Sequence, residues 1–217
     1  MSNAKANILA KLKKQLQGAE RLELSAEPVA EPEVLNQTQN VETFVQLLSA
    51  NHAEVLCITR DEIAATVKTQ LQKRNIDRLM CGTPWVETLQ AIESEITLNT
   101  FYPVIDGHKE ALFNTVPAAI TGSHCGIAAT GSIVLWPTPE EPRTLSLVPP
   151  VHIVVVERNA ICNDLATAMK TQAWKAQLPT NVVLVSGPSK TADIQQTLAY
   201  GAHGPRELVV LLIGHSK

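Results

Sequence analysis

The chain has 217 residues, of which 45% are apolar and 18% are charged, an ordinary composition for a globular protein with one sizeable core. Its net charge of -3 provides no positive field for nucleic acid or for an anionic membrane surface. No apolar run approaches the roughly 20 residues that span a bilayer, and the N-terminus lacks the continuous apolar segment of a secretory signal. We therefore expect a cytoplasmic protein with no membrane span and no nucleic-acid partner.

The first segment is typical of a helical arm. Aliphatic residues recur at helical spacing among lysines within residues 3–17: Ile8, Leu9, Leu12 and Leu16. The stretch 20–36 is acidic and contains two prolines, which favours an extended linker. These features predict an N-terminal helix and linker over residues 1–36, followed by one domain over residues 37–217. The helix either packs on its own domain or reaches a partner subunit.

Beyond the linker, helical and strand-like patterns alternate. We first expect a helix at 41–48, a strand at 54–59, a helix at 61–74 capped by Asp61, a strand at 77–81 and helical turns at 86–92. We then expect a strand at 95–102, a helix at 108–114, strands at 117–120 and 132–136, a proline-rich loop at 137–143, a strand at 151–156, a helix from Asn163 or Asp164 to 172, and strands at 181–185 and 207–213. This order predicts an α/β domain with a mostly parallel sheet flanked by helices.

A turn-rich stretch near the C-terminus, residues 186–206, is the first candidate site. It begins Ser-Gly-Pro-Ser-Lys-Thr-Ala-Asp directly after the strand at 181–185, contains an expected helix at 191–200, and ends before the strand at 207–213. We therefore place it at the carboxyl end of a strand and at a helix N-terminus, where α/β folds bind ligands and anions are favoured. The predicted ligand-binding residues here are Gly187, Ser189, Lys190, Thr191 and Gly204. Alternatively, Ser189, Thr191 or Asp193 only caps the helix.

The glycine-rich loop 121–131 is the second candidate. Backbone N–H groups at its glycines would approach a carboxylate or phosphate closely, and nearby hydroxyls would add donors. The predicted ligand-binding residues of this loop are Gly122, Gly126, Thr130 and Gly131, with the hydroxyl of Ser132 beside them. The alternative is that these glycines only form turns that need positive φ.

Three side chains are catalytic candidates: His152, His203 and Asp193. His152 lies in the apolar strand at 151–156, where a histidine is either a catalyst or a hydrogen-bonded core residue. His203 lies in a Gly-Ala-His-Gly-Pro turn, where an imidazole can donate to an anion, exchange a proton or accept from a local N–H. Asp193 either faces a substrate hydroxyl or a cation, or complements the dipole of the expected helix.

The four cysteines, Cys57, Cys81, Cys125 and Cys162, form no CxxC pair and match no zinc or iron–sulfur spacing. We therefore expect that this chain carries no metal and no cofactor of its own.

Three blocks of residues, taken together and in order, resemble the LUD-domain family of lactate-utilisation proteins. They are Thr121-Gly122…Ile127-Ala128…Thr130-Gly131, then Leu145-Ser146-Leu147…Pro149-Pro150-Val151-His152-Ile153, and Gly187-Pro188-Ser189-Lys190-Thr191-Ala192-Asp193-Ile194 with Gly201…His203-Gly204-Pro205. The resemblance implies an α/β fold similar to the sugar-phosphate isomerase and coenzyme A transferase superfamily. It also implies a role in oxidising L-lactate to pyruvate, in an assembly with two iron–sulfur proteins that would carry the clusters.

The chain departs from the family pattern at three positions. The family commonly has an Asp at the position of His124. It commonly has a Glu at the positions of Ala129 and Gln195. Because coenzyme A transferases use a glutamate as their covalent nucleophile, Ala129 disfavours acyl-transfer chemistry in this chain.

Three functions follow, in order of preference. The first is a subunit of an L-lactate oxidation system beside iron–sulfur partners, with or without a catalytic role of its own. The second is a ligand-binding or regulatory module for a small anionic metabolite. The third is a coenzyme A transferase-like enzyme. Co-purification with cluster-bearing proteins would favour the lactate-oxidation subunit. Ligand binding by the chain alone would favour the binding module, and turnover by the chain alone would favour the transferase-like enzyme.

Overall fold

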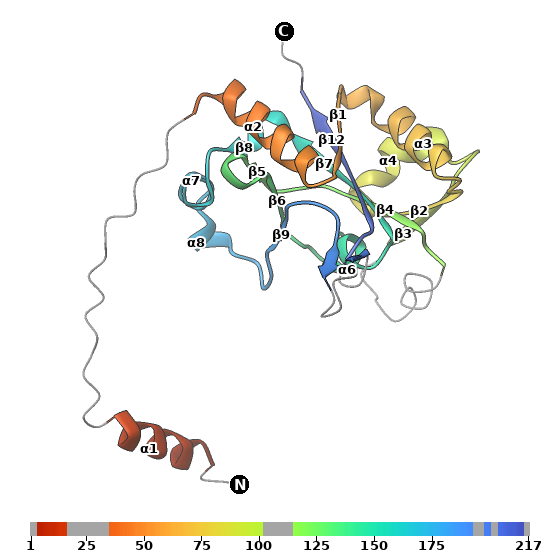
Figure 1. Cartoon of the computed structure of the whole chain (residues 1–217). Helices are drawn as coiled ribbons and strands as arrows, with labels where there is room; N and C mark the ends of the chain where they lie inside the picture. The colour runs from red at the N-terminus through yellow and green to blue at the C-terminus, as the bar shows by residue number, and fades with distance from the viewer. Residues whose placement is uncertain (1–3, 17–34, 102–114, 193–197, 201–203, 215–217) are drawn as a thin grey trace. The chain divides into compact units, whose positions relative to one another are not determined.

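The computed structural model describes residues 4–16, 35–101, 115–192, 198–200 and 204–214, and gives only the backbone of 190–192 and 198–200. The chain divides into two units, Met1–Glu33 and Val34–Lys217 (Figure 1). In the first unit, α1 (Ala4–Leu16) is the predicted helix. The helix predicted at 108–114 lies outside the described residues.

The second unit is built on a six-stranded sheet in which every pair of neighbouring strands is parallel. In sheet order, the strands are β1 (Glu54–Ile58), β12 (Glu207–Ile213), β7 (Val151–Glu157), β4 (Ala118–Thr121), β2 (Arg78–Gly82) and β3 (Thr97–Phe101) (Figure 1). The predicted α/β class with a mostly parallel sheet is therefore confirmed.

The central strands β7 and β12 are apolar along nearly their whole length because both faces of the sheet are covered. Along β12, Val209 and Leu211 join one hydrophobic cluster, whereas Val210 and Leu212 join another on the opposite face. All four side chains are fully buried. These two clusters, on opposite faces of the parallel sheet, form most of the core, and smaller clusters complete it.

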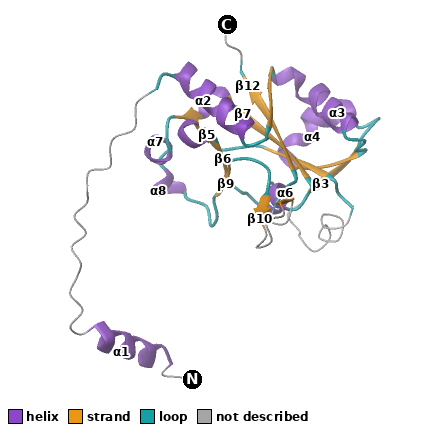
Figure 2. Ribbon diagram, in the orientation of Figure 1, coloured by secondary structure: helices purple, strands orange, loops and turns teal. Residues whose placement is uncertain are grey.

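One face of the sheet is covered by α3 (Ile63–Lys73) and α4 (Val86–Leu89), which lie together in Figure 2. Short 3-10 turns, η1 (Arg60–Glu62), η2 (Thr83–Trp85) and η3 (Gln90–Ile92), flank these helices. The prediction that Asp61 caps this helix is wrong, because Asp61 lies within η1, which Thr59 caps, and Glu62 is the N-cap residue of α3. The Thr59 backbone N–H donates to the Glu62 carboxylate at 2.7 Å.

The other face carries α2 (Gln37–Ala50) and a second, four-stranded sheet. Its order is β8 (Ile161–Cys162), β5 (Cys125–Ile127), β6 (Ser132–Leu135) and β9 (Val183–Val185), with η5 (Ala128–Thr130) between β5 and β6. Asn36 starts α2 with a capping box, because its side chain accepts from the Gln39 N–H and the Gln39 side chain accepts in return. Phe44 of α2 is fully buried above β5 and β8.

The remaining described helices and 3-10 turns are α6 (Arg143–Leu147), η6 (Arg158–Ala160), α7 (Leu165–Thr171) and α8 (Trp174–Gln177). Asp164 is the cap of α7, since its carboxylate accepts from the Thr167 N–H at 2.7 Å. The helix α6 was not predicted. Its single turn is too short for periodicity to reveal, and Leu145 anchors it by burying its side chain against β4.

The helix predicted at 191–200 is wrong. The structure has an antiparallel pair of short strands there, β10 (Lys190–Ala192) and β11 (Leu198–Tyr200). The preceding strand, β9, pairs antiparallel with β6 and so belongs to the second sheet, not to the parallel one. A short apolar run does not distinguish between two sheets, and a short periodic segment fits a strand as well as a helix.

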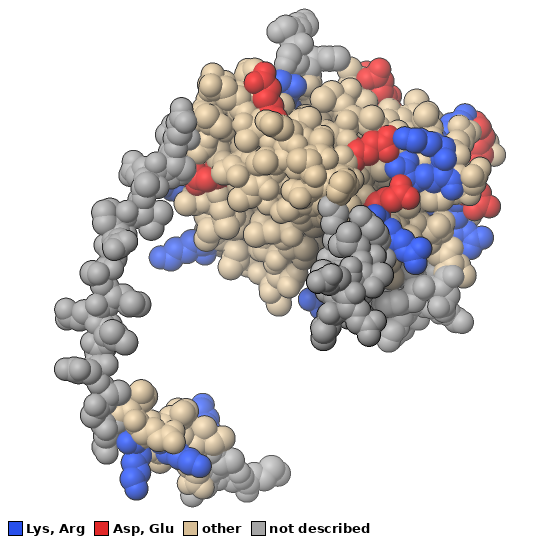
Figure 3. All heavy atoms as spheres, viewed as in Figure 1, with Lys and Arg blue, Asp and Glu red and all other residues tan. Residues whose placement is uncertain are grey.

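Charged side chains of both signs lie side by side around α3 (Figure 3). Arg74 joins Glu54 at 2.8 Å and Glu207 at 2.7 Å, and Lys73 joins Glu54 at 2.9 Å. These ion pairs connect the end of α3 to the first residues of β1 and β12. No helix in the described parts of the chain combines the length and the apolar character that a membrane crossing requires.

Candidate functional site

The two loops predicted as candidate sites meet in the structure through three hydroxyl groups. The Ser132 Oγ lies 2.7 Å from the Ser186 Oγ and 2.8 Å from the Thr130 Oγ1. Ser132 begins β6 and Ser186 follows β9, and these strands are antiparallel partners in which Ile133 lies opposite Val185. The next pair along this ladder is Ser132 and Ser186. We call these three residues the hydroxyl junction.

Two glycines allow the backbone of the hydroxyl junction to lie directly against the last turn of α2. Gly131 has φ of 56°, and a Cβ there would lie 2.5 Å from the Leu47 Cβ. Gly187 has φ of 150°, and a Cβ there would lie 2.8 Å from the Asn51 carbonyl oxygen. Both positions therefore require glycine for packing as well as for backbone conformation. This packing role accounts for both glycines, and their ligand-binding role stays a prediction.

The stretch after the hydroxyl junction leads to the amino-terminal edge of the parallel sheet. The Ser189 N–H donates to the Pro205 carbonyl at 2.8 Å, and the Arg206 N–H donates to the Pro150 carbonyl at 2.7 Å. Pro205 and Arg206 precede β12, and Pro150 precedes β7. The turn does follow the carboxyl end of a strand, β9, as expected, but β9 belongs to the second sheet. The expected helix N-terminus after the turn is wrong, because the strand β10 begins there. This turn can therefore bind an anion only through its hydroxyl and backbone N–H groups, and not through a helix dipole.

A cavity of about 300 Å³ opens beside this turn. Its lining residues are His52, Glu54, Arg74, Pro188, Arg206, Glu207 and Leu208. Burial raises the pKa of Glu54, but hydrogen bonds and charge from Lys73 and Arg74 outweigh it, so the net shift is downward. Arg74 is neutralised by its two carboxylate partners, so Arg206 is the cation of this cavity that an anion would meet.

His152 is fully buried, and its Nε2 lies 2.9 Å from the Thr121 Oγ1. Its Nδ1 is also buried and has no hydrogen-bond partner in the described part of the chain. Burial lowers the pKa of His152 to about 3, so the imidazole is neutral at physiological pH. The structure therefore shows a hydrogen-bonded core histidine, and a catalytic role for it stays a prediction.

The other predicted residues lie in different places. Gly126 is packed beneath Phe44, with only 2.9 Å between a hypothetical Cβ and the ring. Gly122 lies at the carboxyl end of β4, on the opposite edge of the sheet from Ser189, and its N–H donates to Glu141 at 3.0 Å. Asp193 and His203 lie outside the described residues. For Lys190 and Thr191 the structure gives the backbone in β10, and Gly204 lies against the Ser189 side chain at the amino-terminal edge.

Two residues that the sequence did not single out belong to these sites. Ser186 was read only as the start of a turn, because its partner Ser132 is 54 residues away. Glu141 lies in the loop that was read as proline-rich and polar. The sequence could have indicated Glu141, because it lies in the run Trp136-Pro-Thr-Pro-Glu-Glu-Pro142. Prolines restrict the backbone of such a segment, so a carboxylate on it is held in few positions.

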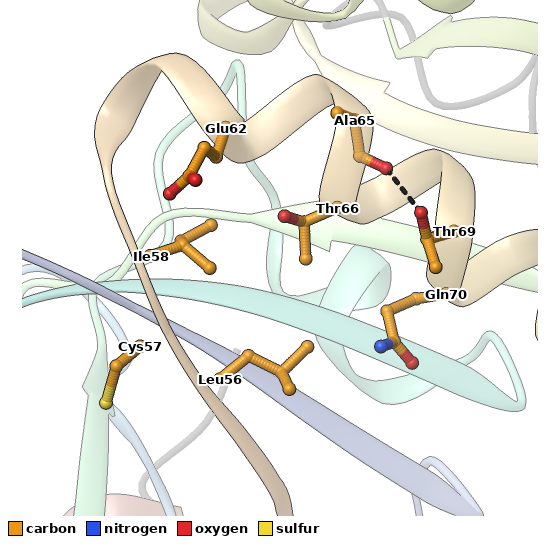
Figure 4. A pocket seen from close by; sticks show the side chains of 8 residues that line it. All are labelled: Leu56, Cys57, Ile58, Glu62, Ala65, Thr66, Thr69 and Gln70. Atoms are coloured by element: carbon orange, nitrogen blue, oxygen red, sulfur yellow. Dashed lines mark hydrogen bonds between the residues drawn. The ribbon is translucent and has the colours of Figure 1, made fainter.

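A further cavity of about 400 Å³ lies between β1 and α3 (Figure 4). Leu56 and Ile58 point toward the helix, whereas Cys57 points to the other side of the strand. The Thr69 hydroxyl is bound to the Ala65 carbonyl at 2.9 Å, and the Glu62 carboxylate to Thr59. The carboxylate of Glu62 and the hydroxyl of Thr69 are thus used locally, and Gln70 accepts from Arg74.

Comparison with known proteins decides the family. The sequence model of the LUD domain matches residues 41–213. The chain belongs to the LUD-domain family. This LUD domain is 35% identical to the uncharacterized protein NMB1437 of Neisseria meningitidis, over 97% of this chain and 94% of that protein. It is 20% identical to lactate utilization protein C of Oceanobacillus iheyensis, over 98% and 96% of the two chains, and 32% identical to the Deinococcus radiodurans protein of that name, over 49% and 50%.

A solved structure supports the fold of this LUD domain. The crystal structure of a DUF162 family protein from Deinococcus radiodurans superposes with a TM-score of 0.62. The match covers 83% of this chain and 99% of the other, at 20% sequence identity. At that identity the likeness concerns the fold alone, which it confirms.

Proposed function

We propose that this chain is a subunit of an L-lactate utilisation system that oxidises L-lactate to pyruvate together with two iron–sulfur proteins. The observation that carries the proposal is the family membership, joined to relatives called lactate utilization protein C, one of which aligns over 98% of this chain. Oxidation removes two electrons and two protons from lactate, so the assembly needs an electron acceptor. The iron–sulfur partners supply it.

The four cysteines support placing the clusters on the partners. Clusters are bound by thiolates, and burial opposes thiolate formation. Burial raises the pKa of Cys81 to about 11 and that of Cys125 to about 12. Cys57 is exposed and Cys162 is half-buried. Within the described residues no three His, Cys, Asp or Glu side chains are grouped as metal ligands.

The helix α1 supports a role in an assembly. Its aliphatic residues recur at helical spacing: Ile8, Leu9, Leu12 and Leu16. Its charged residues are all lysines. An apolar face flanked by positive charge is suited to the groove of a partner protein with an acidic rim.

The hydroxyl junction is the place in this chain that best suits the lactate carboxylate. The two hydrogen bonds within the hydroxyl junction use two of its three hydroxyl protons, so the third, on the exposed Thr130 or the exposed Ser186, can be donated to an anion. A hydrogen bond to a charged group contributes about 1.5–3 kcal/mol. The same arrangement would serve the second candidate function, a binding module for a small anion, in which the chain alone binds lactate.

The assembly test is co-expression of this chain with its two partners and measurement of L-lactate-dependent reduction of an artificial electron acceptor. We expect no reduction when this chain is omitted. A Ser132→Ala/Ser186→Ala double variant is expected to need at least tenfold more L-lactate for half-maximal rate, whereas Ser49→Ala, an exposed serine on α2, leaves the rate unchanged. Full activity without this chain would reject the proposal. Binding of lactate by the chain alone, with no contribution to oxidation, would favour the binding module.

A further inference from the structure

The carboxyl-terminal edge of the parallel sheet holds a cavity that the proposed function does not use. The chain leaves β2 toward β3 on one side and leaves β4 toward β7 on the other, so the β2–β4 boundary is a topological switch point. Open α/β sheets bind ligands outside the carboxyl ends of their strands at such points. The loop 137–142 crosses this edge. Gly82, the last residue of β2, allows the crossing, since a Cβ there would lie 2.5 Å from the Glu140 carbonyl oxygen.

Glu141 places a carboxylate at this edge. Its Oε1 accepts from the Gly122 N–H at 3.0 Å and from the Trp85 indole N–H at 2.5 Å. Its Oε2 has no hydrogen-bond partner among the described residues, and none of the ion pairs found there involves Glu141. Burial raises the pKa of Glu141, although the two N–H donors act in the opposite direction. The carboxylate is therefore fixed in place, and the described residues supply no counter-charge for it.

The cavity next to Glu141 has a volume of about 220 Å³. Its lining residues are Gly122, Ser123, His124, Trp136, Thr138 and Glu141. The His124 ring packs against Trp136 with centroids 4.1 Å apart. Burial lowers the pKa of His124, which the Gln172 side chain partly opposes, so His124 is not the cation that balances Glu141 at neutral pH. The Ser123 hydroxyl donates to the Val155 carbonyl and so presents only lone pairs.

We propose that this cavity binds a small organic cation, an alkylammonium or alkylguanidinium, whose N–H groups donate to the Glu141 Oε2 while its alkyl part lies against Trp136. A carboxylate with one free oxygen, acceptor lone pairs and an indole wall is the combination that selects such cations. An anion is repelled by Glu141. The volume lies below the roughly 300–1,000 Å³ of usual ligand sites, which limits the ligand to a few heavy atoms.

This site is separate from the hydroxyl junction. The cavity lies at the carboxyl-terminal edge of the parallel sheet, whereas the stretch after the hydroxyl junction leads to the amino-terminal edge. The cavity also requires a ligand of the opposite charge. The inference therefore stands whether or not the chain takes part in lactate oxidation, and it suggests that a cationic metabolite is sensed or carried by the same domain.

Methylguanidinium is a suitable probe, titrated into the purified full chain at constant ionic strength. The chain contains three tryptophans. Trp136 lines the cavity, Trp85 donates to Glu141 of the lining, and Trp174 packs on Trp136 with centroids 5.4 Å apart. Their indole N–H signals in a two-dimensional nitrogen–proton NMR spectrum therefore report binding at this place. We expect saturable shifts, largest for the Trp85 indole, which donates to Glu141.

Two variants and one control decide the matter. Glu141→Gln keeps an oxygen that accepts from Gly122 and Trp85 but removes the charge, and we expect at least tenfold weaker binding. Trp136→Leu removes the aromatic wall without altering the carboxylate, and we expect several-fold weaker binding. Glu140→Gln, the exposed neighbour, leaves the affinity unchanged. Equal binding by the wild type and Glu141→Gln, an equal loss in Glu140→Gln, no saturable shift, or the same shift with acetate would each overturn the proposal.

Discussion

Replacing His152 by glutamine is expected to remove a large part of the pH dependence of stability between about pH 6.5 and pH 3. Burial lowers the pKa of His152 from 6.5 to about 3 in the folded chain. Between these two values the unfolded chain binds a proton that the folded chain does not, so the free energy of unfolding falls as the pH falls. One pKa unit corresponds to about 1.4 kcal/mol, so the loss approaches roughly 4–5 kcal/mol near pH 3.

Urea unfolding at a series of pH values measures this effect. The wild-type free energy of unfolding is expected to fall more steeply with decreasing pH than that of His152→Gln, even though the variant is less stable at pH 7 because it loses the contact with Thr121. His52→Gln, at an exposed position, should keep the wild-type slope. If His152→Gln and the wild type have parallel curves over this range, then the imidazole is not held neutral by burial.

Substituting Gly131 by alanine is expected to lower the free energy of unfolding by roughly 2–5 kcal/mol. The left-handed backbone at φ of 56° costs a non-glycine residue about 1–2 kcal/mol. The new Cβ would lie 2.5 Å from the Leu47 Cβ and 3.1 Å from the Leu48 backbone nitrogen, so α2 must move away from the second sheet. Such overpacking costs a further 1–3 kcal/mol or so.

Gly122→Ala is the matched control for this substitution. A Cβ on Gly122 would make ordinary contacts, 3.4 Å to Glu141 and 3.5 Å to Trp85, and we expect a loss below about 1 kcal/mol. The shifts in urea midpoint, at constant m-value, give the loss of unfolding free energy in each of the two variants. Equal losses at the two glycines would show that the contact between Gly131 and α2 does not hold the second sheet in place.

The parallel sheet could be predicted from the sequence because its central strands are buried on both faces. The continuous apolar runs 151–156 and 207–213 leave little choice of structure, and both became strands of the sheet. The run 181–185 was equally apolar, but β9 is short and partly exposed, with Leu184 50% exposed, and its partner is β6. Periodicity reports burial, and it does not report which sheet a strand joins.

The candidate site was predictable in its parts but not in its arrangement. The motifs around Thr130 and Gly187 were both recognised, yet only the antiparallel register of β6 and β9 brings Ser132 to Ser186. The turn at 186–189 was expected at the carboxyl edge of the parallel sheet because the run 181–185 fits a strand of that sheet followed by a helix, whereas β9 pairs with β6 in the second sheet. Glu141 was missed because its function depends on Gly122 and Trp85, which lie 19 and 56 residues away.

Growth on L-lactate as the sole carbon source tests the central claim most directly. The gene for this chain is deleted in a strain that has no other L-lactate dehydrogenase, and the strain is compared with one that carries the restored wild-type gene. We predict that the deletion strain fails to grow on L-lactate, grows normally on pyruvate, and recovers with the wild-type gene. Normal growth of the deletion strain on L-lactate would contradict the assignment to lactate oxidation.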